Sequence, residues 1–162
     1  TMKEYAYSFK VKDLNPYIKY LQNNQYIFVS KNLQIRELYK NKSNIMARIT
    51  IDIENEIKNI SLDFKDDKDL EDVLKVSNES IPLIVKEYNI ESVKSILEIL
   101  GYKKYKTLNR SRTVYKKNNV KFELDSYTSP DKMFVVGIDG ENDEVEIIYK
   151  DVKNKIDDLT HN

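Results

Sequence analysis

The sequence has 162 residues, enough for one domain with its own hydrophobic core, and its 27 basic residues balance 27 acidic residues. Without net charge the chain has no global field that would favour duplex DNA or a membrane as partner, so any anion site must be local. The lack of cysteine excludes disulfides, thiolate metal sites and cysteine nucleophiles, and three glycines are too few for a glycine-rich phosphate loop.

Residues 3–11 alternate strictly, with Tyr5, Tyr7 and Phe9 on one face and Glu4 and Ala6 on the other, which predicts a half-buried strand. A helix with Pro16 in its first turn is expected after Asp13, which can cap it. Three strands follow as an antiparallel meander, at 26–40, 45–54 and 58–65.

The pattern breaks at residues 66–90, where an acidic turn, a short helix at 69–75 and an apolar segment at 81–88 predict a helical excursion outside the sheet. An amphipathic helix over 91–100 extends this excursion to residue 100 and ends at Gly101. Strands are predicted at 103–115, 120–127 and 132–139, and a C-terminal helix within 141–160, capped by Asn142. The whole chain is interpreted as a single α+β domain.

Charged residues gather on one face of the predicted strand at 103–115, where Arg110 and Arg112 alternate with Ser111 and Thr113. Two guanidinium groups on one face can hold phosphate oxygens bidentately. The alternative is an ordinary solvated sheet face.

Carboxylates share one face of the next strand, at Glu123 and Asp125, and Asp139 lies on the strand after it. Three carboxylates near several arginines would either coordinate magnesium or neutralise the arginines. The only histidine, His161, is next to last in the sequence, which argues against serine–histidine and two-histidine mechanisms. The 12 tyrosines mostly occupy expected core positions, so they indicate an aromatic core rather than base stacking.

The segments 100–102, 109–115, 122–125 and 134–140 follow in an order that resembles the C-terminal half of the CYTH family, the triphosphate tunnel metalloenzymes. That family includes class IV adenylate cyclases and thiamine triphosphatases. The resemblance implies a closed or nearly closed antiparallel eight-stranded β-barrel over residues 3–140 with flanking helices. It also implies a basic lumen that binds a small-molecule triphosphate or nucleotide together with Mg²⁺ or Mn²⁺.

Residue roles follow from the same resemblance, although no catalytic residue is assigned. The residues expected to bind phosphate are Lys10, Arg36, Arg48, Lys65, Arg110 and Arg112. The residues expected to bind metal are Glu4, Glu123, Asp125 and Asp139. Lys10 is included because it lies two residues beyond the position where the family has its lysine.

The sequence departs from the family pattern at five positions, one of which is Asp139, a shorter carboxylate where the family has glutamate. Ala6 and Gly137 replace glutamates, Ser8 replaces a lysine, and Thr50 replaces an arginine. Two hypotheses therefore remain. The first is a divergent member that binds a triphosphate-containing anion, with magnesium-dependent triphosphatase or adenylate cyclase-like activity as an extension. The second is a catalytically inactive ligand-binding or protein-interaction domain on the same barrel.

Two further expectations come from what the sequence lacks. It has no signal-peptide pattern and no apolar run of membrane-spanning length, so a cytoplasmic protein that does not bind membranes is expected. The oligomeric state is not indicated by any motif.

Overall fold

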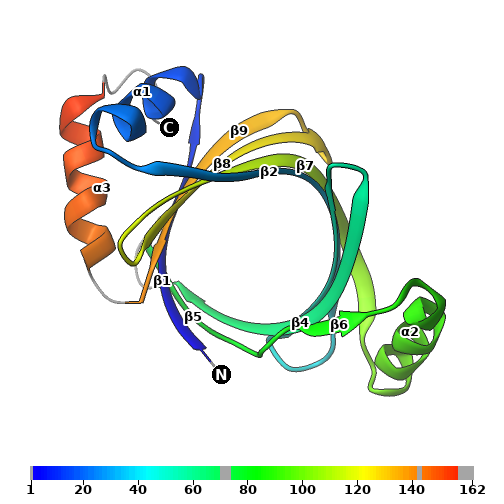
Figure 1. The fold of residues 1–162 in the computed structure, drawn as a ribbon. Helices are drawn as coiled ribbons and strands as arrows, with labels where there is room; N and C mark the ends of the chain where they lie inside the picture. The colour runs from blue at the N-terminus through cyan, green and yellow to red at the C-terminus, as the bar shows by residue number, and fades with distance from the viewer. Residues whose placement is uncertain (1, 70–73, 142–143, 157–162) are drawn as a thin grey trace.

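The computed structural model describes residues 2–69, 74–141 and 144–156, in which short helices separate runs of consecutive strands (Figure 1). In chain order they are β1 Met2–Val11, α1 Asn15–Asn23, β2 Ile27–Lys40, β3 Ile45–Glu54, β4 Ile57–Asp69, β5 Leu74–Glu79, β6 Leu83–Val85, the 3₁₀ turn η1 Glu87–Asn89, α2 Ile90–Ile99, β7 Lys103–Lys117, β8 Val120–Ser129, β9 Met133–Gly140 and α3 Glu144–Lys155.

The sheet closes on itself. Its strand order is β3-β2-β7-β8-β9-β1-β5-β4-β6, and β3 also pairs with β4, so eight strands of the described chain form a ring while β6 pairs only with β4. Every pairing is antiparallel, and Figure 1 views the ring along the barrel. The predicted α+β fold with a closed eight-stranded barrel is confirmed.

Two hydrophobic cores lie on the outside of the barrel wall. In the first, α1 and α3 cover the outward faces of β1, β8 and β9, with Phe9, Tyr17, Phe122 and Ile138 buried between them. In the second, α2 packs through Leu97 onto the outward faces of β3, β4 and β6. Figure 1 shows α1 and α3 together on one side of the barrel and α2 on the opposite side.

This placement fixes which face of each strand looks inward. In β1, Tyr7, Phe9 and Val11 are buried under the helices, so Glu4 and Ala6 on the alternate face line the interior. Apolar residues therefore face outward and polar residues face the lumen, the reverse of a barrel with a packed interior.

The prediction of a helical excursion starting at residue 66 is wrong for most of that segment. The strand β4 continues to Asp69, β5 begins at Leu74, and β6 adds three more residues to the sheet. The predicted helix at 69–75 fails at Asp69, Leu74 and Lys75, while residues 70–73 lie outside the described structure. Because β5 joins β1 to β4, this misread segment is the one that closes the ring.

Two helix predictions are confirmed by α2 and by α3, and Pro16 does occupy the first turn of α1. The proposed cap at Asn142 lies outside the described residues. Within the described parts of the chain, no helix combines the length and apolar character that crossing a bilayer requires.

Candidate functional site

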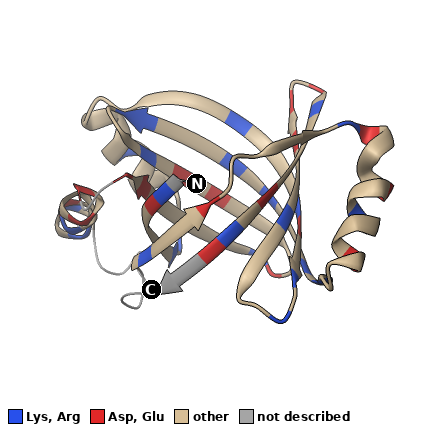
Figure 2. Cartoon of the chain, turned by 90° about the horizontal axis from the view of Figure 1, so that it is seen from below, with Lys and Arg blue, Asp and Glu red and all other residues tan. Residues whose placement is uncertain are grey.

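The barrel encloses a cavity of about 380 Å³ whose wall is dominated by charged side chains. Seven of the lining residues are basic, namely Arg36, Arg48, Lys65, Lys75, Arg110, Arg112 and Lys121. Six are acidic, namely Glu4, Asp63, Glu79, Glu123, Asp125 and Asp139. Figure 2 shows that these two kinds of residue are distributed over several strands of the barrel. The lumen is a polar chamber with nearly balanced charge.

Nine of the ten residues predicted for the site line this cavity. The inward direction of Arg110 and Arg112 is as predicted, and Arg110 is only 6% exposed. Lys10 is the exception, because it is exposed and lies in a separate hollow with Tyr127 and Phe134. The structure therefore separates Lys10 from the other predicted phosphate-binding residues, whose roles stay predictions.

Arg112 forms the most complete ion-pair network of the lumen. Its Nε and Nη2 donate to the two oxygens of Asp125 at 2.8 and 2.9 Å, and its Nη1 lies 2.7 Å from Glu123 Oε2. Register explains the first pair, because Arg112 lies directly opposite Asp125 across the β7–β8 ladder. Although burial opposes the charged form, Glu123 and Asp125 raise the pKa of Arg112 far above its usual value.

Arg48 is neutralised in the same way by two carboxylates. It bonds both oxygens of Asp63, which faces it across the β3–β4 ladder, and its Nη2 lies 2.7 Å from Glu79 Oε1 on β5. Arg48 and Arg112, two of the six predicted phosphate ligands, are thus already paired with carboxylates. An incoming anion would compete with carboxylates for them.

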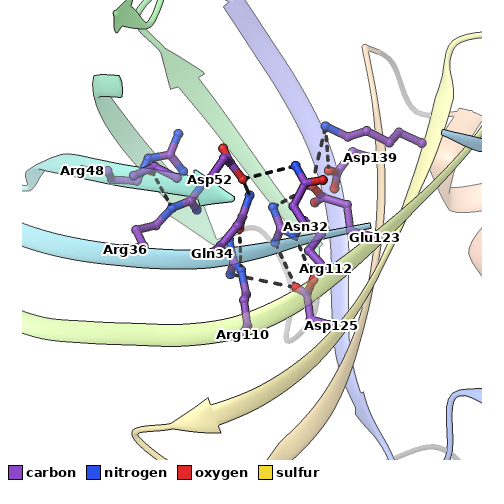
Figure 3. A network of polar contacts seen from close by, with 12 residues as sticks. Asn32, Gln34, Arg36, Arg48, Asp52, Arg110, Arg112, Glu123, Asp125 and Asp139 are labelled. Atoms are coloured by element: carbon purple, nitrogen blue, oxygen red, sulfur yellow. Dashed lines mark hydrogen bonds and ion pairs between the residues drawn. The ribbon is translucent and has the colours of Figure 1, made fainter. Parts of the chain in front are cut away.

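Arg110 and Arg36 differ from these two arginines because neutral groups hold them. Arg110 Nε donates to Gln34 at 2.8 Å, and its Nη1 forms a long ion pair of 3.9 Å with Asp125 (Figure 3). The same Nη1 donates to the Tyr127 hydroxyl at 2.6 Å. Arg36 Nε donates to the Thr50 hydroxyl at 3.0 Å. Thr50, the residue that replaces a family arginine, thus serves as an acceptor for Arg36.

Excess positive charge remains around these two guanidinium groups. In the described part of the chain, Arg36 has no carboxylate within ion-pair distance, and Arg110 Nη2 is buried without any hydrogen-bond partner. Burial, followed by the charges of Arg110 and Arg48, lowers the pKa of Arg36 to about 9. Arg36 remains charged at neutral pH, and an anion placed here would relieve the repulsion between the arginines.

The carboxylates of the opposite wall have unlike proton affinities. Burial alone would raise the pKa of Glu123, but the charges of Arg112 and Lys121 lower it far below its usual range. Burial, then the charge of Glu123 and a hydrogen bond between the two carboxyl groups, raises the pKa of Asp139 well above its usual value. Burial and the charge of Glu79 also raise the pKa of Glu4. Glu123 therefore holds a proton less tightly than an ordinary glutamate carboxyl does, and Asp139 holds one more tightly than an ordinary aspartate.

We expect Asp139→Asn to stabilise the protein more at pH 8 than at pH 4. A carboxyl with a raised folded pKa favours folding most below its unfolded pKa and loses that contribution as the pH rises through the folded pKa. The amide removes this loss and still donates to Glu123. The free energy of unfolding in urea, measured at steps from pH 4 to pH 8, tests this. Parallel pH profiles for wild type and variant would contradict it, and exposed Asp131→Asn serves as the control.

Sequence reasoning missed Lys121, Asp63 and Glu79. Lys121 precedes Glu123 by two residues on the same strand face, and Asp63 precedes Lys65 in the same way, so alternation alone could have placed both in the lumen. Glu79 was hidden because its strand was read as part of a helical segment. Lys75 and Ser77 on that strand also line the cavity, and they mark the period of two that was overlooked.

The predicted metal site does not fit the residues present. Mg²⁺ requires near-octahedral oxygen coordination, but both oxygens of Asp125 and one oxygen of Glu123 contact Arg112. Among the residues that the structure describes, no group of three or more acidic or histidine side chains has a metal-binding arrangement. Ala6 and Gly137 supply no donors on the same wall.

Comparison with known proteins identifies the fold but no sequence relative. No protein-family profile and no curated protein matches the sequence. Among solved structures, the PH1012 protein of Pyrococcus horikoshii is 18% identical, with 98% of this chain and 94% of that chain covered and a TM-score of 0.77. A putative adenylyl cyclase from Hippeastrum, described as having a dominant triphosphatase activity, is 11% identical, with 94% and 87% covered and a TM-score of 0.68.

A third solved structure is similar to the same extent as the second. It is a chain of the Schizosaccharomyces pombe Mediator head module, 10% identical, with 94% of each chain covered and a TM-score of 0.68. Taken together with the order of motifs in the sequence, these likenesses show that the chain has the CYTH-type tunnel fold, at sequence identities of only 10–18%.

Proposed function

We propose that the lumen binds the linear triphosphate of a small molecule or nucleotide. The observation that carries this proposal is the buried Arg110 Nη2, which has no hydrogen-bond partner among the described residues and lies near the charge of Arg36. Within the same residues, Arg36 has no carboxylate at ion-pair distance. Buried donors in proteins are nearly always satisfied, so an orphaned guanidinium nitrogen indicates a place for an anion. Charge-assisted bonds from guanidinium to phosphate are among the strongest hydrogen bonds available.

The size and the partial neutralisation of the cavity fit the same ligand. Its volume of about 380 Å³ is within the range of small-molecule sites, which begins near 300 Å³. Gln34 and Tyr127 hold Arg110 in position, so its orientation costs little on binding. Inorganic tripolyphosphate contains the feature shared by nucleoside and thiamine triphosphates, and it is therefore the probe of choice.

Tripolyphosphate is expected to raise the melting temperature of the wild-type protein. At a hundredfold excess over the dissociation constant, binding to the native state alone contributes about 2.7 kcal/mol, which corresponds to roughly 5–10 °C for a domain of this size. Differential scanning fluorimetry measures the melting temperature, and isothermal titration calorimetry measures the dissociation constant. Both are performed in EDTA, so that the arginines alone are tested.

Arg36→Ala is the discriminating variant because, among the described residues, Arg36 bonds only a threonine hydroxyl. Loss of a charged hydrogen bond of about 1.5–3 kcal/mol is expected to weaken binding roughly ten- to a hundredfold. Exposed Lys103→Ala removes the same charge outside the lumen and is expected to leave affinity unchanged. No thermal shift at millimolar tripolyphosphate, or equal weakening by both variants, would overturn the proposal.

A protein-interaction domain on the same barrel is the second candidate. It is favoured by the similar chain in the structure of the Mediator head module. Large apolar side chains are also exposed on the outer surface, among them Ile27, Leu33, Ile57 and Ile84. Such side chains fit a partner surface. This candidate takes precedence if tripolyphosphate does not bind.

A further inference from the structure

Lys121 places an ammonium group inside the carboxylate cluster where the family resemblance implies a metal. Its Nζ lies 3.7 Å from Glu123 Oε2 and 3.8 Å from Asp139 Oδ2, at the end of the lumen near Glu4. The position is set by strand register, because Lys121 lies opposite Asp139 on β9 and two residues before Glu123 on β8. Its side chain is 39% exposed, so it enters the cluster from the mouth of the barrel.

The charge of Lys121 is matched to this cluster. The field of Glu123 is the largest influence on its pKa, which is raised despite burial, and Asp139 and Glu4 act in the same direction. Glu123 is held from the other side by Arg112 at 2.7 Å. The cluster is therefore closed by two basic side chains of the protein.

The neighbouring wall provides room but no further ligand. A Cβ added at Gly137 would lie 3.7 Å from Glu123 Oε1 and 3.9 Å from Asp139 Oδ1, which are ordinary contact distances. A carboxylate side chain at this position would thus meet the cluster without a backbone clash, yet the residue is glycine. Ala6, on the same lumen wall, likewise carries no donor. Two wall positions thus lack a metal-binding side chain, and the ammonium of Lys121 supplies a positive charge to the same carboxylates.

We propose that the ammonium of Lys121 takes the place of a divalent cation in the Glu123–Asp139 cluster, so that the lumen binds its polyanion without metal. The first half of this proposal concerns the cluster alone. The second half rests on the proposed function, since it assumes that tripolyphosphate binds. The two halves are tested by separate measurements.

The first measurement titrates Mn²⁺ in the absence of phosphate and follows free Mn²⁺ by electron paramagnetic resonance. Lys121→Met removes the charge and keeps much of the length, so it is expected to bind Mn²⁺ with a dissociation constant of about 0.1–1 mM, typical of weak oxygen-ligand sites. Wild type, Lys121→Arg and Lys103→Met are each expected to bind at least tenfold more weakly. Circular dichroism verifies folding, and Lys121→Gln replaces the methionine variant if that variant does not fold.

Two outcomes overturn the role of Lys121: tight Mn²⁺ binding by the wild type, or no gain in binding by either neutral variant. The second measurement compares the affinity of the wild type for tripolyphosphate in EDTA and in Mg²⁺ by calorimetry. Equal or weaker binding in Mg²⁺ is expected, and a tenfold or larger gain with Mg²⁺ would overturn metal independence. Absence of binding in both buffers contradicts the proposed function, while the Mn²⁺ titration still decides the role of the ammonium.

Discussion

Arg112→Ala is expected to lower the free energy of unfolding at pH 7 by about 3–5 kcal/mol, the usual loss when one partner of a buried ion pair is removed. The guanidinium holds three carboxylate oxygens of Glu123 and Asp125, whose side chains are 14% and 4% exposed. Without it, two adjacent carboxylates face each other in the lumen. Urea unfolding followed by circular dichroism gives the difference.

The pH dependence of this loss distinguishes a charge effect from a packing effect. Arg112 lowers the folded pKa of Glu123, so its contribution is present above the unfolded pKa and is lost as the pH falls through the folded value. The difference between wild type and variant should therefore shrink below about pH 5. Lys103→Ala is the matched control, with a change of less than about 0.5 kcal/mol expected for an exposed charge. A loss that is the same at pH 4 and pH 7 would show that packing, not charge, is responsible.

Phe122→Ala is expected to lower the free energy of unfolding by about 3–5 kcal/mol at any pH between 5 and 8. The ring is 0% exposed and packs between the barrel wall and α1, with its centroid 5.0 Å from that of Tyr26 and 6.2 Å from that of Tyr20. Truncation leaves a cavity in the core that fixes the outward face of β8. Chemical denaturation measures the loss.

Phe134→Ala makes the same truncation on the neighbouring strand where the ring is 39% exposed, so a loss of about 1 kcal/mol is expected there. At temperatures where it is folded, Phe122→Ala should keep the tripolyphosphate affinity of the wild type, because its ring lies outside the lumen. Similar losses for the two phenylalanines would contradict the assignment of Phe122 to the main core.

Together these variants separate the two sides of the barrel wall. Side chains on the outer face stabilise the fold by burial under α1, α2 and α3, whereas side chains on the inner face hold one another by ion pairs. The structure thus allows lumen residues to change with little effect on the apolar packing. Ala6, Ser8, Thr50 and Gly137 all lie on inward faces of strands whose outward faces are covered.

The sequence by itself determined the strands that carry most of the site and the faces on which their charges lie. Alternation is a local property, so the apolar residues next to Glu123 and Asp125 place both carboxylates on the opposite strand face. Arg110 and Arg112 alternate with polar residues, so their inward direction was expected from the family resemblance. The alternation rule failed for β5, because its inward residues Lys75, Ser77 and Glu79 are polar and its strand is short. The pattern of a short alternating segment next to acidic residues does not distinguish a strand from a turn or a helix until the strands that pair with it are known.

Only the tertiary structure decided which basic side chains of the lumen are paired with carboxylates. Arg48 meets Glu79 across 31 positions and Arg110 meets Gln34 across 76 positions. These distant pairings depend on strand register around a closed ring, which a local pattern does not contain. Register pairs Arg112 with Asp125 and places Lys121 opposite Asp139, whereas it places Thr50 opposite Arg36, whose Nε donates to the threonine hydroxyl. Of the predicted phosphate ligands, Arg48 and Arg112 are thereby paired with two carboxylates each, whereas Arg36 and Arg110 form their hydrogen bonds with neutral groups.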